Sequence, residues 1–225
     1  MPNHATPVPA IRLQITEIYL SVQGESTFAG LPCTFIRLTG CPLRCTYCDT
    51  EYAFYGGSKV ALDDVLTKVR DYGCPLVEVT GGEPLAQPNC IPLLQALLDS
   101  GHTVLLETSG AYTLASVPRE VRKIVDLKCP SSGEQHRNLY ENMELLAPHD
   151  EVKFVLGSRE DYEWAVEQVR SYNLPERCAA VLFSCVFGKL EPATLVDWMV
   201  ADKLFSVRMQ LQAHKFIWPP DTKGV

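Results

Sequence analysis

Three cysteines, Cys41, Cys45 and Cys48, lie close together in the segment GCPLRCTYCDT. Three thiolates on one short loop can converge on a single metal centre. A structural zinc site normally has four protein ligands, and the chain has no second close pair such as C-x2-C or H-x3-H. A four-iron, four-sulfur (4Fe-4S) cluster held by three cysteines leaves one iron without a protein ligand, so that a small molecule can bind there. The spacing therefore favours an iron-sulfur centre that takes part in chemistry.

A second motif, TGGEP, occupies residues 80–84 directly after an apolar segment. Together with the cysteine spacing, and with the aromatic Tyr47 before the last cysteine, it resembles the radical S-adenosylmethionine (SAM) superfamily. The resemblance implies that TGGEP holds the methionine end of SAM, which chelates the open iron. Gly81 and Gly82 would let backbone groups approach this amino acid closely, and Glu83 would offer a carboxylate to its ammonium.

Short apolar runs alternate with amphipathic segments along most of the chain. This pattern indicates the strands and helices that must position the two motifs. The pattern predicts strands at 34–38, 76–79, 103–106, 124–127, 152–156, 180–183 and 207–211, and helices at 61–72, 91–100, 160–171 and 192–201. Strands separated by helix-length segments predict an α/β fold with a mostly parallel sheet. Six or seven such units are fewer than a closed eight-unit barrel needs, so we expect an open or partial βα barrel. Residues 1–10 are expected to be a mobile arm, and 11–225 a single domain.

Polar side chains follow the predicted strands where each strand ends. They are Glu83, Glu107, Thr108, Ser109, Lys128, Ser184, His214 and Lys215. Open α/β enzymes build their sites at the carboxyl ends of their strands. We therefore expect these residues to gather around one site, although loops are polar for other reasons too.

Composition and charge exclude several classes of protein. The chain has 46% hydrophobic and 21% charged residues and a net charge of −7, which is typical of a globular protein and argues against broad nucleic-acid binding. No apolar run is long enough to cross a membrane, and the start of the chain does not resemble a secretory signal. A cytoplasmic protein is expected. Nine cysteines without an export signal favour metal chemistry over a disulfide framework.

A narrower resemblance covers residues 14–218 and rests on six motifs. They are SVQGES (21–26), FIRLTGCPLRCTYCDT (35–50), TGGEP (80–84), ETSG (107–110), DLKCP (126–130) and QLQAHKFIW (210–218). The sequence is similar in these motifs to the 7-carboxy-7-deazaguanine synthases. The resemblance implies a magnesium-dependent homodimeric lyase that uses SAM and a 4Fe-4S cluster. It would contract 6-carboxy-5,6,7,8-tetrahydropterin to 7-carboxy-7-deazaguanine with loss of ammonia, in queuosine biosynthesis, with electrons from an external donor such as a flavodoxin.

The resemblance also implies roles for individual residues. Cys41, Cys45 and Cys48 would ligate the cluster, and Thr50 would offer Mg²⁺ a hard oxygen ligand. The SAM site would comprise Tyr47, Cys48, Asp49, Gly82, Glu83, Ser109, Asp126, Leu127, Lys128, Ser184, Cys185, Val186 and Phe187. The substrate site would comprise Val22, Gln23, Gly24, Glu25, Arg37, Thr80 and His214, with Arg37 gripping a carboxylate. No side chain is predicted to be catalytic, because a radical derived from SAM abstracts the hydrogen.

The chain departs from the family pattern at three places, and three alternative functions remain open. Relatives often have Ser-Pro-Lys in place of residues 126–128 and a proline in place of Cys185, and in some the chain ends soon after His-Lys, whereas here it continues through residues 219–225. An activating enzyme that acts on a protein partner shares the cysteine spacing. A non-catalytic iron-sulfur electron carrier or a zinc-stabilised module would need a fourth ligand, for which Cys33 or Cys74 is the nearest candidate.

Overall fold

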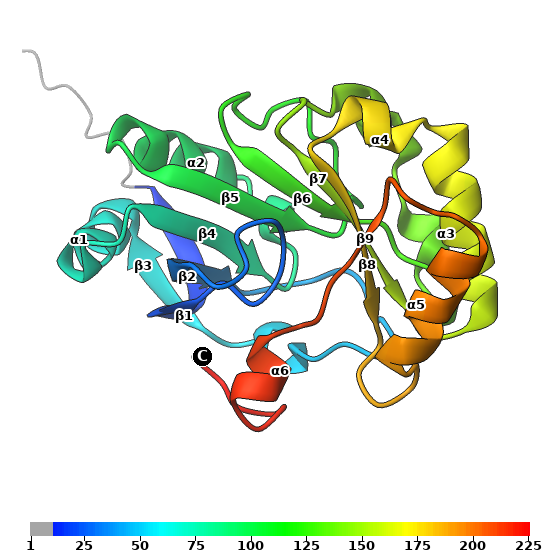
Figure 1. Cartoon of the computed structure of the whole chain (residues 1–225). Coiled ribbons are helices and arrows are strands. Elements are labelled where there is room, and N and C mark those ends of the chain that lie inside the picture. Colours follow the sequence, from blue (N-terminus) through cyan, green and yellow to red (C-terminus); the bar gives the residue numbers. More distant parts are fainter. Residues whose placement is uncertain (1–10) are drawn as a thin grey trace, which may run out of the picture.

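Residues 11–225 are described by a computed structural model, and their strands form one nine-stranded sheet (Figure 1). The predicted arm at 1–10 lies outside the described residues. The strands are β1 (Arg12–Val22), β2 (Pro32–Leu38), β3 (Ser58–Ala61), β4 (Leu76–Gly81), β5 (Thr103–Thr108), β6 (Arg122–Asp126), β7 (Glu151–Leu156), β8 (Ala180–Cys185) and β9 (Arg208–Met209). The α-helices are α1 (Leu62–Tyr72), α2 (Cys90–Asp99), α3 (Arg159–Ser171), α4 (Leu174–Arg177), α5 (Pro192–Ala201) and α6 (His214–Ile217).

The sheet is an open, mostly parallel partial barrel, which confirms the predicted fold class. Its strand order is β3-β1-β2-β4-β5-β6-β7-β8-β9. From β2 to β9 each neighbouring pair is parallel, whereas β1 runs antiparallel to both β2 and β3. Because β3 and β9 are the two edges and do not pair, the sheet does not close. The carboxyl ends of the parallel strands therefore meet at one open end.

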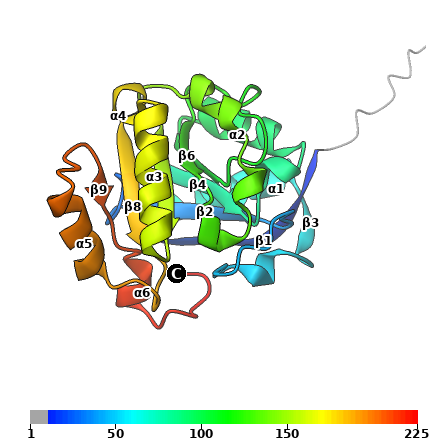
Figure 2. The same ribbon diagram turned by 90° about the vertical axis from the view of Figure 1, so that its right-hand side faces the viewer.

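The longer helices cover the outside of the curved sheet (Figures 1 and 2). Helix α3, which the sequence predicts at 160–171, is capped at its start, because the Ser158 hydroxyl accepts a hydrogen bond from the Asp161 N–H at 3.2 Å. Gly73 ends α1 in the left-handed conformation at φ 65°, which glycine adopts without strain. The longest helix, α3, has 13 residues, and no helix within residues 11–225 is suited in length and composition to span a membrane.

The two faces of each parallel strand have different roles, because successive side chains alternate between them. The outward side chains, such as Val77 and Val79 of β4, pack in the main core beneath the helices. The inward side chains form a second, smaller core of Cys33, Phe35, Leu76, Leu105 and Ile124, which Cys74, just before β4, completes. Further along the same inward rows, polar side chains replace apolar ones: Glu78 follows Leu76, and Glu107 follows Leu105. This change creates a polar chamber at the open end.

Several predicted elements differ from the structure. Strands β1 and β3 were not predicted; β1 has a register irregularity between Ile15 and Glu17, so its side chains do not alternate regularly in the sequence. The predicted strand at 207–211 is wrong beyond Arg208–Met209, because the Gln210 and Gln212 side chains turn to bind Glu25. The connection from β6 to β7 contains three 3-10 turns (Pro130–Ser132, Gln135–Arg137, Tyr140–Leu145) in place of an α-helix, and the connection from β5 to β6, residues 109–121, contains neither kind of helix.

Candidate functional site

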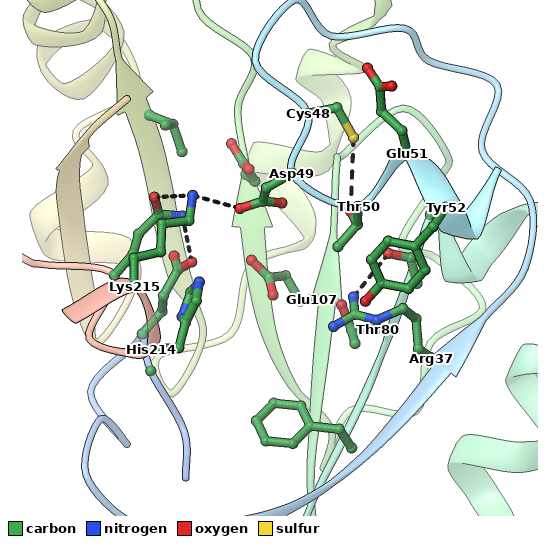
Figure 3. Close-up of a pocket in the computed structure, with 18 of the residues that line it drawn as sticks. Arg37, Cys48, Asp49, Thr50, Glu51, Tyr52, Thr80, Glu107, His214 and Lys215 are labelled. Carbon is green, nitrogen blue, oxygen red and sulfur yellow. Dashed lines mark hydrogen bonds and ion pairs between the residues drawn. The ribbon is translucent and has the colours of Figure 1, made fainter. Parts of the chain in front are cut away.

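A cavity of about 470 Å³ occupies the open end of the partial barrel. Its walls come from the β1–β2 loop, the cysteine loop after β2, the ends of the parallel strands, α6 and residues 220–225. Figure 3 shows Cys48 and Thr50 on one side and His214 and Lys215 on the other, with Glu107 between them. Most of the strand-end residues predicted from the sequence therefore line this one cavity.

The cysteine loop presents all three predicted cluster ligands, Cys41, Cys45 and Cys48, to the cavity. Hydrogen bonds within the loop and from a neighbouring segment hold it in place. The Arg44 guanidinium donates to the Cys41 carbonyl at 2.8 Å, and the Thr46 N–H donates to the Ser132 carbonyl at 3.0 Å. Burial raises the pKa of Cys41, and it raises that of Cys45 to about 11. Three thiols on an anchored loop beside an open cavity fit a 4Fe-4S cluster with one iron left for another ligand.

The two glycines of TGGEP have a packing role that the sequence did not reveal. A Cβ atom on Gly81 would lie 2.6 Å from the Leu38 carbonyl oxygen, and one on Gly82 would collide with the Gly40 carbonyl and with Cys41. Strand β4 can therefore lie directly against the start of the cysteine loop only because both residues lack a side chain. Gly82 lines the cavity and remains available to a ligand.

Glu83 lies elsewhere than the sequence predicted. Its side chain is fully buried and does not line the cavity. The carboxylate accepts hydrogen bonds from the Leu85 N–H at 2.9 Å, the Thr108 hydroxyl at 2.8 Å, and the Ser109 N–H and hydroxyl at 2.8 and 2.6 Å. With its lone pairs engaged in this way, Glu83 fixes the ends of β4 and β5 relative to each other and does not offer a free carboxylate to a ligand.

The other predicted SAM residues divide into two groups. Tyr47, Cys48, Asp49, Gly82, Ser109, Asp126, Lys128, Val186 and Phe187 line the cavity. Leu127, Ser184 and Cys185 do not: Leu127 is packed in the main core, Ser184 is fully buried, and Cys185 borders a separate cavity of about 270 Å³.

Two buried polar atoms near this region are left without a partner in the described part of the chain. They are Asp126 Oδ1 and Ser184 Oγ. The other carboxylate oxygen of Asp126 is 2.8 Å from the Lys128 ammonium. Burial alone would raise the pKa of Asp126, but the ammonium groups of Lys128 and Lys153 outweigh burial and lower it. An ionised, half-satisfied carboxylate in the cavity wall fits a bound ligand with hydrogen-bond donors.

All seven predicted substrate residues line the cavity. Arg37 is already paired, since its Nε is 2.8 Å from Glu17 and it donates to the Tyr19 hydroxyl at 3.1 Å. Gly24 passes so close to His214 that a Cβ would lie 2.5 Å from the imidazole Nδ1. Burial lowers the pKa of His214, so the ring is mainly neutral at pH 7.

The segment after Cys48 carries the predicted magnesium ligand. Thr50 lines the cavity, with its hydroxyl 3.8 Å from the Cys48 sulfur. The Asp49 carboxylate is paired at 2.7 Å with the Lys215 ammonium of α6 (Figure 3). Burial acts to raise the pKa of Asp49, but Lys215, together with Lys153 and His214, outweighs burial and the pKa is lowered. This pair joins the cysteine loop to α6 across the cavity.

The cavity residues that sequence reasoning missed include three groups that bear on the chemistry of the site. Lys153 and Glu78 lie in the middle of strands that read as buried and apolar, and Glu107 was noted only for its position after a strand. The residues 220–225 also line the cavity, and the Lys223 ammonium lies 4.5 Å from the centre of the Tyr52 ring. The signal for Lys153 and Glu78 is the charged residue among apolar ones in EVKFVL and LVEVTG.

Comparison with known proteins identifies the family. A model of the radical SAM superfamily matches residues 35–197. Two 7-carboxy-7-deazaguanine synthases, from Koribacter versatilis and Chlorobaculum tepidum, are 48% and 45% identical to this chain. The matches cover 95% of this chain in each case, and 100% and 97% of those proteins. The chain belongs to the 7-carboxy-7-deazaguanine synthase family of the radical SAM superfamily.

Solved structures show the same architecture. QueE from Escherichia coli matches with a TM-score of 0.73 and 23% identity, over 90% of this chain and 95% of that one. Streptococcus suis SuiB bound to its precursor peptide SuiA matches with a TM-score of 0.55 and 14% identity, over 73% of this chain and 45% of SuiB. At these identities the comparison shows the fold alone, an open barrel of the radical SAM type.

Proposed function

We propose that this protein contracts 6-carboxy-5,6,7,8-tetrahydropterin to 7-carboxy-7-deazaguanine with loss of ammonia, in the biosynthesis of 7-deazapurines such as queuosine. The observation that carries the proposal is that one cavity holds both the cysteine triad and the substrate motifs around Glu25, Arg37 and His214. Membership of the 7-carboxy-7-deazaguanine synthase family supports the same reaction. The radical SAM family implies a 4Fe-4S cluster and SAM as cofactors.

The cofactors would be held by residues that line the cavity. Cys41, Cys45 and Cys48 would ligate the cluster, and Gly82 and Asp126 would contact SAM. When bound, the cluster and SAM supply one-electron cleavage of the sulfonium and removal of a hydrogen atom from C6 of the pterin. The chain's own task is to position that carbon and to keep water and stray hydrogen donors away from it.

Glu25 is suited to bind the amide edge of the pterin. Burial acts to raise the pKa of Glu25, but the Lys153 ammonium and the hydrogen bonds from Lys153 and Gln212 outweigh burial and lower it. The carboxylate is therefore ionised at pH 7 and can accept from the amino and ring N–H groups. The neutral ring of His214, beside Gly24, can share the same edge of the substrate.

Further parts of the proposal rest on the family resemblance and on donor chemistry. Thr50 would ligate Mg²⁺ together with the carboxylate of the substrate, since both are hard oxygen donors. Arg37 would attract that carboxylate, although Glu17 shares its charge. We also propose an external one-electron donor such as a flavodoxin, a homodimer, and a cytoplasmic location.

Product analysis tests the proposal. Anaerobically reconstituted protein is incubated with the pterin, SAM, Mg²⁺ and a reductant, and the products are separated by mass spectrometry. We expect 7-carboxy-7-deazaguanine and ammonia without any added protein partner. Reduction of the cluster and cleavage of SAM with no change in the pterin would contradict the proposal and would favour an activating enzyme that acts on a protein.

A further inference from the structure

Lys153 lies at the centre of the polar chamber and contacts carboxylates from three separate elements. Its ammonium is 2.9 Å from Glu25 of the β1–β2 loop, pairs with Glu107 of β5, and is 3.7 Å from Asp126 of β6. The Lys153 side chain is only 4% exposed. A buried ammonium is costly unless several partners replace its water, and here three carboxylates do so.

Three other cations of the cavity wall each have a carboxylate partner of their own. Arg37 pairs with Glu17, Lys128 with Asp126, and Lys215 with Asp49, at 2.7 to 2.8 Å. Lys153 is left to serve both Glu25 and Glu107. One positive charge between two carboxylates leaves an excess of negative charge facing the cavity. Such a group suits a ligand edge that is rich in N–H donors.

The Glu25 carboxylate is held from two sides. Gln212 donates to its Oε1 at 2.9 Å, and Gln210 donates to Oε2 at 3.3 Å, while Lys153 contacts Oε2. The two glutamines come from the segment after β9, whereas Lys153 comes from the middle of β7. Without Lys153, the two glutamines would have to hold an anion beside the Glu107 carboxylate. Lys153 is therefore the contact that lets two acidic groups remain close together.

We propose that Lys153 is a positioning residue for substrate binding: it clamps Glu25 and Glu107 side by side so that both carboxylates face the donor edge of the pterin. The inference deepens the proposed function and rests on it. Lys153 acts through the two carboxylates and is not itself required to touch the substrate. If Lys153 acted only in folding, replacing it would have the same kind of effect as replacing another buried lysine.

The chain offers such a lysine as a matched control. Lys123 of β6 is also buried, at 4% exposure of its side chain, and is 2.9 Å from the Asp150 carboxylate, but neither residue lines the cavity. Lys153→Met and Lys123→Met therefore each remove one buried ammonium from its carboxylate partners. Both variants are expected to lose stability. Only the first should alter substrate binding.

The experiment compares Lys153→Met, Lys153→Arg and Lys123→Met after anaerobic reconstitution. Pterin binding is measured by calorimetry, and KM and kcat by product formation; SAM binding is followed separately. For Lys153→Met we expect the pterin Kd and KM to rise at least about tenfold, the effect of losing a charge-assisted contact, with a much smaller change for SAM. Lys153→Arg should recover part of the loss because it keeps the charge, and Lys123→Met should bind the pterin normally.

The pH profile separates positioning from a general loss of packing. The charged or titratable groups around Glu25 are Lys153 of β7, Glu107 of β5, Glu78 of β4, and His214 of α6. Without Lys153, burial and the neighbouring carboxylates raise the pKa of Glu25, so the carboxylate takes up its proton at higher pH. The acid limb of kcat/KM should therefore shift to higher pH in Lys153→Met and remain in place in Lys123→Met.

If Lys153→Met does not fold, Lys153→Met/Glu107→Gln removes the repulsion between the two carboxylates while still leaving Glu25 without its ammonium. The same rise in pterin Kd is expected for that variant. Unchanged pterin Kd, KM and acid limb in either folded variant would overturn the inference. Failure of the wild-type protein to convert the pterin would instead overturn the proposed function, so the two failures are distinguishable.

Discussion

Replacing Glu83 with glutamine tests whether this residue organises the site or contacts SAM. Its two carboxylate oxygens accept from two backbone N–H groups, those of Leu85 and Ser109, and from two hydroxyls. An amide keeps one acceptor oxygen and turns the other position into a donor. The hydroxyls can rotate, but at least one buried N–H must lose its acceptor and face another donor.

The size of the effect follows from these contacts. Losing one hydrogen bond to a charged group and leaving its buried donor unpaired costs about 3 kcal/mol. For a protein of this size the corresponding loss in Tm is about 6 to 12 °C. Because Glu83 does not line the cavity, the SAM Kd should change less than about threefold in the fraction that remains folded.

The assay is anaerobic thermal unfolding of the reconstituted protein, combined with SAM binding well below the melting range. Glu120→Gln, which changes an exposed carboxylate, serves as the control and should leave Tm within about 1 to 2 °C. A Glu83→Gln variant with wild-type Tm and a tenfold weaker affinity for SAM would refute the reasoning. That result would support a direct contact between Glu83 and SAM, as the sequence predicts.

Other residues give predictions of the same kind. Gly82→Ala should lower the iron content after reconstitution, because its Cβ would collide with Gly40 and Cys41; full cluster occupancy would contradict the packing role. Thr50→Ala should abolish the magnesium dependence of activity while the cluster absorbance stays unchanged, and a retained magnesium response would exclude Thr50 as a ligand. Lys223→Ala should raise the substrate KM by about two- to fivefold, the range of an exposed cation–π contact, if residues 220–225 close the cavity as their position indicates; an unchanged KM would show that they do not.

The sequence predicted most of the central parallel strands well. Apolar runs such as 152–156 and 180–183 appear as β7 and β8, and the helix predicted at 160–171 appears as α3, capped by Ser158. These features depend on local chemistry, namely apolar continuity and a side chain that can cap a helix. The spacing of the three cysteines likewise brings them to one cavity, because they lie on a single loop.

The contacts among side chains in and around the polar chamber were harder to predict. The charge of Lys153 in EVKFVL indicates that one face of this buried strand is polar, but it does not indicate which carboxylates, far away in the sequence, that face meets. Glu83 shows a related limit. Its motif predicts that the carboxylate binds SAM, whereas in the structure the carboxylate accepts hydrogen bonds from Thr108 and Ser109. Pairings between distant segments depend on tertiary structure and not on local pattern.

The same limit explains the errors in the elements. In β1 the irregularity near Glu17 breaks the two-residue repeat, and after β9 the side chains of Gln210 and Gln212 are drawn to Glu25. The first error arises from a local break in strand register, and the second from side-chain contacts with a distant residue of the cavity.

The central claim is that three cysteines hold a 4Fe-4S cluster whose remaining iron is open to SAM in this cavity. The most direct measurement is electron paramagnetic resonance of the reduced, reconstituted protein, titrated with SAM whose amino and carboxylate groups are isotopically labelled. We predict a changed cluster signal that couples to both labels and is lost together with the cluster when Cys45 is replaced by alanine. A signal unaltered by SAM, or a cluster with a fourth protein ligand, would contradict the account.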